Sequence, residues 1–260
     1  MSEIAAGRAA GELTAPITRR FYARTAWFFL GIGIVGFAPT YWVPLLRGTL
    51  QVEPLAHIHA LVFYGWLVLL CWQTMLVAAG RTPRHRELGV AGVSLATAMC
   101  LVGVAMALQT VRRQQAAGFE EAAFAFASVP LLGIALFATL FVLAVTNVKR
   151  PEIHKRFMLV ATASLLQAGI GRWFLLFLAP PLPAGSVRPP PPVFVPLLPG
   201  LVVVLIILGL MLHDRRSRGH VHPAYQAAGG MVLFVELLRT PLSGTAAWTA
   251  TVNWLLAVVP

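Results

Sequence analysis

The sequence predicts an all-α fold, a polytopic transmembrane helix bundle, on the strength of three observations. First, 58% of the 260 residues are hydrophobic and 11% are charged, whereas soluble domains average about 45–50% apolar and about 25% charged residues. Second, six stretches reach the roughly 20 apolar residues that a helix needs to cross a hydrocarbon core of about 30 Å. Third, Lys and Arg are concentrated in alternate connections between those stretches. This composition excludes a soluble enzyme and a disordered chain.

The apolar stretches predict six spanning helices in one transmembrane domain, residues 25–213. A cytoplasmic segment, residues 1–24, precedes this domain, and a helical tail, residues 214–260, follows it. The first span is too long for the apolar core of a signal peptide, so it is interpreted as a retained helix. The six predicted spans cover roughly residues 25–46, 55–80, 88–111, 122–147, 157–180 and 192–213.

The tail contains two short apolar stretches, 231–238 and 248–259, separated by a polar Arg-Thr-Pro sequence. Neither stretch reaches spanning length, and Trp248 and Trp254 are typical of an interfacial anchor. We therefore expect a C-terminal interfacial or partly inserted helical tail. A seventh span with a kink at Pro241 is the alternative.

The distribution of basic residues predicts the orientation. Fifteen of the 20 Lys and Arg residues lie in the N-terminal segment, the 81–86 and 149–156 loops and the chain after residue 213. The other connections hold four, and Arg172 lies inside a predicted span. The positive-inside rule then places both termini in the cytoplasm. Topology thus accounts for the net charge of +11, and no nucleic-acid partner is expected.

The absence of acidic residues and lysine from the cores of the predicted spans distinguishes between classes of membrane protein. The nine acidic residues all lie outside the cores of the predicted spans, whereas ion-coupled transporters usually need an intramembrane carboxylate. This disfavours a transporter. The spans also lack a lysine, which excludes a retinal Schiff base.

Polar side chains within two spans follow single helix faces. His59, Trp66 and Gln73 recur at helical steps on the second span, and His154 and Arg172 share a face of the fifth. A charged Arg172 in the outer third of a span is costly and should face protein, a cavity or an anionic group. The alternatives are that Arg172 extends to the exterior headgroups and that both faces pack against other helices.

Histidines near the ends of spans are the candidate metal ligands. His85 and His154 both begin helices on the cytoplasmic side, so they could share one iron as the axial ligands of a b-type haem. His59 lies a full span of about 30 Å from His85 and could not join them. His57 and His59 are the alternative ligands for copper or zinc, although at i and i+2 they point about 200° apart on an ideal helix. Each histidine could instead interact with headgroups or backbone carbonyls.

The sequence around these histidines resembles a widespread family of uncharacterised bacterial multi-pass membrane proteins. The resemblance covers residues 55–175, and its motifs are Gln73, His85-Arg86-x-Leu88-Gly89 and His154-Lys155-Arg156-x-Met158. That family shares its pattern of histidines at helix starts with cytochrome b561-like and ferric-reductase-like membrane haem proteins. In b561-like proteins, histidines on alternate helices of a four-helix core pair to hold haem.

This resemblance implies that His85 and His154 form one such haem-ligating pair. The basic residues beside them, Arg84, Arg86 and Arg156, would then lie near the haem propionates or lipid phosphates. A second pair would need a partner for His59 in the fourth span, which contains no histidine. The resemblance therefore implies a single haem, in a protein of the bacterial cytoplasmic (inner) membrane.

The sequence thus favours an integral membrane redox protein that binds one haem b and exchanges electrons with a quinone or a membrane partner subunit. His59, Trp66 and Gln73 would line a polar track or small-molecule site towards the exterior, and Arg172 belongs to the same set of candidate cofactor-binding residues. Such a chain could be a component of a membrane haem oxidoreductase, although no catalytic residue is assigned. The alternative is a cofactor-free membrane subunit, alone or as a homo-oligomer, that binds a lipid, a metal ion or a partner protein.

Overall fold

The computed structural model describes residues 2–178 and 187–259, with side chains from residue 20 onward. Within these ranges six helical segments are long and apolar enough to cross a membrane. They are Arg20–Leu46, Pro54–Ala78, Thr82–Ala116, Glu120–Thr146, Pro151–Leu178 and Leu197–Arg218. The predicted all-α helical bundle is confirmed, and its six long apolar helical segments identify an integral membrane protein. The last two residues predicted for the fifth span, 179 and 180, lie outside the described residues.

Several spans consist of more than one helical element. The first combines α1, η1 and α2, the fourth combines α5 and α6, and the fifth combines α7 and α8. The elements in chain order are α1 (Ser2–Phe37), the π-helix η1 (Ala38–Trp42), α2 (Val43–Leu46), α3 (Pro54–Ala78), α4 (Thr82–Ala116), α5 (Glu120–Phe126), α6 (Ser128–Thr146), α7 (Pro151–Leu165), α8 (Gln167–Leu178), α9 (Leu197–Arg218), α10 (Pro223–Ser243) and α11 (Ala246–Val258).

Proline and glycine determine where several of these helices begin and end. Pro54, Pro83 and Pro151 lie in the first turns of α3, α4 and α7, where a backbone N–H has no intrahelical partner to lose. Gly80 and Gly219 follow α3 and α9 with φ angles of 74° and 80°. This left-handed conformation ends a helix and favours glycine. The short cytoplasmic connections predicted from charge therefore also follow from local backbone chemistry.

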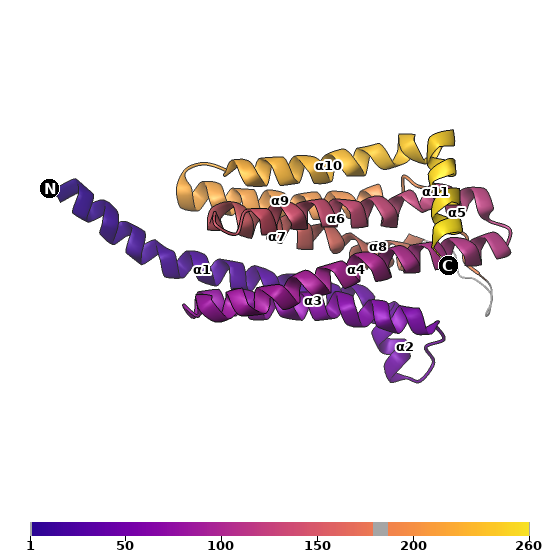
Figure 1. Cartoon of the computed structure of the whole chain (residues 1–260), viewed down its shortest axis with the longest axis horizontal. Coiled ribbons are helices and arrows are strands. Elements are labelled where there is room, and N and C mark those ends of the chain that lie inside the picture. Colours follow the sequence, from indigo (N-terminus) through magenta and orange to yellow (C-terminus); the bar gives the residue numbers. More distant parts are fainter. Residues whose placement is uncertain (1, 179–186, 260) are drawn as a thin grey trace.

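The helices form an elongated bundle (Figure 1). Helix α3 packs against α1 and α4, α6 packs against α4 and α7, and α8 packs against α1 and α9. The core consists mainly of fully buried apolar side chains such as Phe29, Met99, Leu140, Val160 and Ile207. Large apolar side chains also cover the outside of the spans, including Leu61, Val90, Leu101 and Leu205. An apolar exterior of this kind fits a hydrocarbon environment.

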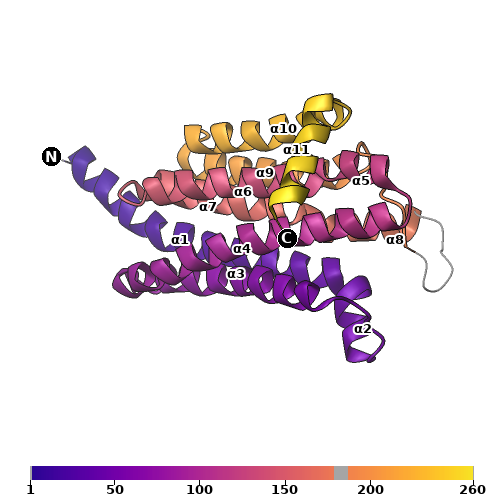
Figure 2. The same cartoon turned by 45° about the vertical axis from the view of Figure 1, so that its right-hand side comes forward.

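Helix α10 differs from the short tail segments expected from the sequence. It is one continuous helix of 21 residues that includes Pro241. It lies lengthwise beside α9 and also contacts α6 and α7 (Figures 1 and 2). At 1.5 Å per residue its length is about 31 Å, similar to the thickness of the hydrocarbon core. The Arg239-Thr240-Pro241 sequence, which predicts a division between two short stretches, lies inside this helix.

Helix α11 lies at the end of the bundle where α4 ends and α5 begins. The indole N–H of Trp248 donates to the carbonyl of Phe124 at 2.8 Å, and the guanidinium of Arg112 donates to the carbonyl of Leu256 at 3.1 Å. Trp248 is therefore buried against α5, while Trp254 stays exposed. This end of the bundle is opposite to the 81–86 and 149–156 loops (Figure 1). The basic residues after position 213 predict instead that the tail lies on the same side as those loops.

This arrangement predicts that α11 and the 81–86 loop are accessible from opposite sides of the membrane. Thr251 and Arg86 are both exposed and suit single-cysteine reporters, once Cys71 and Cys100 have been replaced by alanine. A membrane-impermeant maleimide should label Thr251→Cys in intact cells and Arg86→Cys only after permeabilisation. If both reporters react from the same side, α10 does not cross the membrane.

Candidate functional site

His85 and His154 lie together at the end of the bundle where α4 and α7 begin. Their ring centroids are 6.3 Å apart and their ring planes cross at 75°. His154 Nδ1 lies 2.8 Å from the carbonyl oxygen of Ala144. Because a carbonyl oxygen can only accept, Nδ1 carries the hydrogen, and Nε2 of the neutral ring keeps its lone pair. The structure thus brings together the two histidines that the sequence analysis paired.

One buried polar atom of this pair, and one of a neighbouring residue, have no hydrogen-bond partner among the described residues. One is Nδ1 of His85 and the other is Oε1 of Gln73. The backbone of Gln73 also makes a polar contact with the His85 ring. A buried polar atom without a partner is costly and calls for an explanation, such as a ligand. Gln73 therefore belongs to the His85 end of the bundle rather than to an exterior track.

The three arginines predicted near haem propionates have different environments. Arg84 and Arg86 are exposed, and Arg84 lines an open depression of about 430 Å³ together with Arg81 and Pro83. Arg156 is fully buried and points elsewhere. Its Nε donates to Asp214 at 3.2 Å, and a terminal nitrogen donates to the Glu152 carboxylate at 2.7 Å. The guanidinium of Arg156 is therefore occupied by carboxylates of the protein itself and is not available to a propionate.

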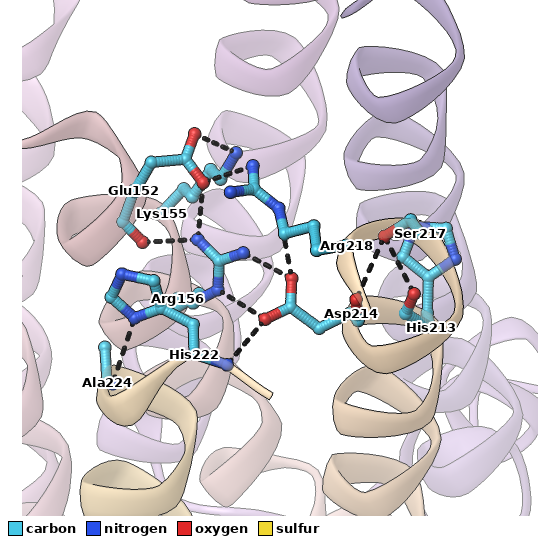
Figure 3. Close-up of polar contacts among 9 residues, drawn as sticks. All are labelled: Glu152, Lys155, Arg156, His213, Asp214, Ser217, Arg218, His222 and Ala224. Atoms are coloured by element: carbon cyan, nitrogen blue, oxygen red, sulfur yellow. Dashed lines mark hydrogen bonds and ion pairs between the residues drawn. The ribbon is translucent and has the colours of Figure 1, made fainter. Parts of the chain in front are cut away.

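Arg156 is the centre of an ionic cluster that joins the start of α7, the end of α9 and the connection to α10 (Figure 3). A second terminal nitrogen of Arg156 pairs with the other oxygen of Asp214, which makes the contact bidentate. Arg218 pairs with both Asp214 and Glu152. The backbone N–H of His222 donates to Asp214 at 2.9 Å. Asp214 thus holds the connection between α9 and α10 against α7.

His222 completes this connection as the cap of α10. Its Nδ1 accepts from the backbone N–H of Ala224 at 3.1 Å, which requires an unprotonated nitrogen. Burial lowers the pKa of His222 below its usual value, and the positive charge of Arg156 adds to this effect. The neutral ring therefore persists at neutral pH. Stability from this cap should be complete above the ordinary histidine pKa of about 6.5 and should decline as the pH falls below it.

The two histidines at the start of α3, His57 and His59, do not converge on a common point. A hydrogen bond of 2.9 Å joins Nδ1 of His57 to the Tyr41 hydroxyl, and the His59 ring stacks on Phe63 with centroids 4.2 Å apart. Nδ1 of His59 is buried without a partner among the described residues. In the part of the chain that the structure describes, no group of three or more His, Cys, Asp or Glu residues could hold a metal ion.

Trp66 lies in the core and not beside an open track. Its indole N–H donates to Thr162 Oγ1 at 3.1 Å, which joins α3 to α7. Its ring meets Phe137 and Phe141 edge-on, with centroids 5.4 and 5.6 Å away. Trp66 is almost fully buried. The shared face of His59, Trp66 and Gln73 is thus mostly a helix-packing face.

A second buried ionic cluster, missed by the sequence analysis, lies between α8, α9 and α10. Arg239 NH1 lies 2.8 Å from the carboxylate of Glu236 and donates to Gln167 Oε1 at 2.8 Å. The Gln167 amide in turn donates to Glu236 at 3.0 Å and to the carbonyl of Pro196 at 2.8 Å. All three polar side chains are at most 8% exposed. A carboxylate is therefore present within the bundle, neutralised by an arginine one helical turn away.

Arg172 lies in the middle of α8, where this helix packs against the first span. Its Nε donates to Thr40 Oγ1 and its NH1 donates to the carbonyl of Ala168, both at 3.0 Å. The guanidinium carbon lies 4.0 Å from the centroid of the Phe37 ring. The predicted common face of His154 and Arg172 is interrupted, because the helix breaks between α7 and α8 at Leu166.

In comparisons with known proteins, no family model, no curated protein and no solved structure matches this chain. The similarity to b561-like proteins therefore remains an expectation based on the residues quoted above.

Proposed function

We propose that this integral membrane protein binds one b-type haem through His85 and His154 and exchanges electrons with a quinone or a membrane partner subunit. The observation that carries the proposal is the separation of the two rings. Imidazoles on opposite sides of one metal ion, with metal–nitrogen bonds of about 2.0 Å, have their centroids roughly 6 Å apart. The two centroids here are 6.3 Å apart.

The number of ligands favours haem over a bare metal ion. Zinc and copper sites usually need three or four protein ligands, and the described residues supply only two histidines at this position. Haem brings its own equatorial nitrogens and needs just two axial ligands from the protein. The unpartnered Nδ1 of His85 and the free Nε2 of His154 are consistent with this requirement.

The residues around the pair would hold and orient the cofactor. The Ala144 carbonyl fixes the tautomer and ring orientation of His154, as hydrogen-bond partners of metal-ligating histidines commonly do. Arg84 and Arg86 are free to contact propionate carboxylates at the cytoplasmic surface. When bound, the haem would supply one-electron redox chemistry, while the protein supplies ligation, orientation and the surrounding dielectric.

Removal of either histidine should abolish haem binding while the bundle still folds. In haem-supplemented expression, His85→Ala and His154→Ala should each lose most of the Soret absorbance per protein. His220→Ala is the matched control, because His220 is exposed beyond the end of α9. Monodisperse elution of all three variants in detergent would verify folding. Full haem content in both His85→Ala and His154→Ala would show that other residues hold the iron.

A further inference from the structure

We propose that Arg172 forms a binding site for the phosphate group of an anionic phospholipid at the exterior end of the bundle. The site is distinct from the proposed haem site and does not depend on it. The first argument is charge. Both hydrogen-bond acceptors of Arg172, Thr40 and the Ala168 carbonyl, are neutral, and the ion pairs among the described residues do not include it. An arginine charge within a span is costly unless an anion compensates it.

The backbone is built to place Thr40 and Phe37 against Arg172. Helices α1 and α8 approach so closely at Gly36 and Gly169 that a Cβ on Gly36 would lie 2.7 Å from the Cα of Gly169. Small residues allow this close approach between transmembrane helices. Arg172 lies about one turn beyond this contact on α8, and Thr40 lies one turn beyond it on the first span.

The local helix geometry adds to this arrangement. Thr40 belongs to the π-helix Ala38–Trp42, which widens the first span immediately after the glycine contact. The Thr40 hydroxyl and the Phe37 ring together fix the guanidinium in one orientation. Its second terminal nitrogen has no partner among the described residues. A fixed cation with free donors is what binding of a phosphate oxygen requires, since arginine can contact phosphate through two N–H groups.

The depth of Arg172 fits a lipid headgroup. The span Pro151–Leu178 has 28 residues, or about 42 Å at 1.5 Å per residue, which exceeds the hydrocarbon thickness by about 12 Å. Arg172 lies six residues before Leu178, about 9 Å from the helix end. With the excess length shared between both ends, Arg172 is close to the boundary between acyl chains and headgroups.

Aromatic side chains mark the same level of the bundle. The Trp42 indole N–H donates to the Tyr64 hydroxyl at 2.9 Å, and that hydroxyl donates to the Gly33 carbonyl at 2.8 Å. The Trp173 indole N–H donates to the Val35 carbonyl at 2.9 Å. Trp and Tyr are enriched where helices cross the membrane interface. The chemistry around Arg172 therefore favours a phospholipid over a ligand of the aqueous phase.

The test is binding of phosphatidylglycerol to the purified full-length protein in detergent, measured by the rise in melting temperature as lipid is added. Wild-type protein should be stabilised by phosphatidylglycerol much more than by phosphatidylcholine or inorganic phosphate. Arg172→Met should weaken the apparent affinity for phosphatidylglycerol roughly tenfold, the factor expected for loss of a charge-assisted contact. Arg47→Met removes an exposed cation from the same end of the bundle and should bind as wild type does.

A second variant keeps the test decisive should Arg172→Met fail to fold. Thr40→Val removes only the hydroxyl that orients Nε and should weaken phosphatidylglycerol binding by a smaller factor, about two- to fivefold. Equal phosphatidylglycerol affinity in wild type, Arg172→Met and Thr40→Val would overturn the site. Equal stabilisation of wild type by inorganic phosphate would overturn the lipid as the ligand.

Discussion

Replacement of Asp214 by alanine should lower the free energy of unfolding by about 3–5 kcal/mol, the cost typical of removing one partner of a buried ion pair. Arg156 is fully buried, and both oxygens of Asp214 contact its guanidinium. Without Asp214, the Arg156 charge keeps only the half-exposed Glu152 as its carboxylate partner. The connection between α9 and α10 also loses the contact from the His222 backbone. Equilibrium unfolding in mixed detergent micelles would measure the loss.

Two further variants separate the ion pair from simple loss of packing. The double variant Arg156→Met, Asp214→Leu replaces both charges by apolar groups and should recover much of the lost stability, because it leaves no buried charge unpaired. Glu152→Ala should cost less than about 1 kcal/mol, since the Glu152 side chain is 41% exposed and its ion pairs are partly solvated. If the double variant is as unstable as Asp214→Ala, the cluster stabilises the protein by some means other than charge pairing.

Replacement of Glu236 by leucine should destabilise the packing of α10 by a similar amount, about 3–5 kcal/mol. This change leaves Arg239 buried with Gln167 as its remaining side-chain partner. The Nε of Arg239 already lacks a partner among the described residues, so the arginine has little compensation left. The Glu236 carboxylate packs directly against Gly200 of α9, where a Cβ would collide with it. The loss should appear as release of α10 from α8 and α9.

The corresponding double variant, Glu236→Leu with Arg239→Leu, should restore the packing of α10. It removes both charges from the second half of α10 and leaves no buried charge unpaired there. Protection of a cysteine at the buried position Val232 from maleimide would report whether α10 is packed. The Val232→Cys protein without other changes should be protected from maleimide, and so should the double variant that carries this cysteine. Glu236→Leu with the same cysteine should react. Protection in all three would mean that the ion pair does not hold α10 in the bundle.

The spans were predictable from sequence because apolar length alone determines which helices cross a hydrocarbon core. Helix α10 was not, because Arg239-Thr240-Pro241 looks like an interruption until the fold pairs Arg239 with Glu236. The spacing of Glu236 and Arg239, three residues apart between Pro223 and Gly244, was the available signal for one helix with an internal ion pair. A hydropathy average treats every charged residue as exposed to water. It therefore underestimates how well a segment is buried when its charged residues form ion pairs with one another.

The position of each candidate haem ligand along its helix was predictable from the sequence, and so was the end of the bundle at which it lies. His85 and His154 begin spans on the same side, and the structure brings their rings together. Arg156 was assigned to a propionate because its partner, Asp214, lies 58 residues further along the chain. Trp66 was assigned to a polar track because its helix face also carries His59 and Gln73, although packing against Phe137 and Phe141 explains its position. Contacts between residues that are far apart in the sequence can be identified only once the fold is known.

The most direct test of the proposed function is a reduced-minus-oxidised absorbance spectrum of the wild-type protein, purified in detergent after haem-supplemented expression. Sharp α and Soret bands, with about one haem per chain, are the result that ligation by His85 and His154 predicts. A colourless protein that elutes as a folded, monodisperse species would contradict haem binding and leave a cofactor-free membrane subunit as the account of this bundle.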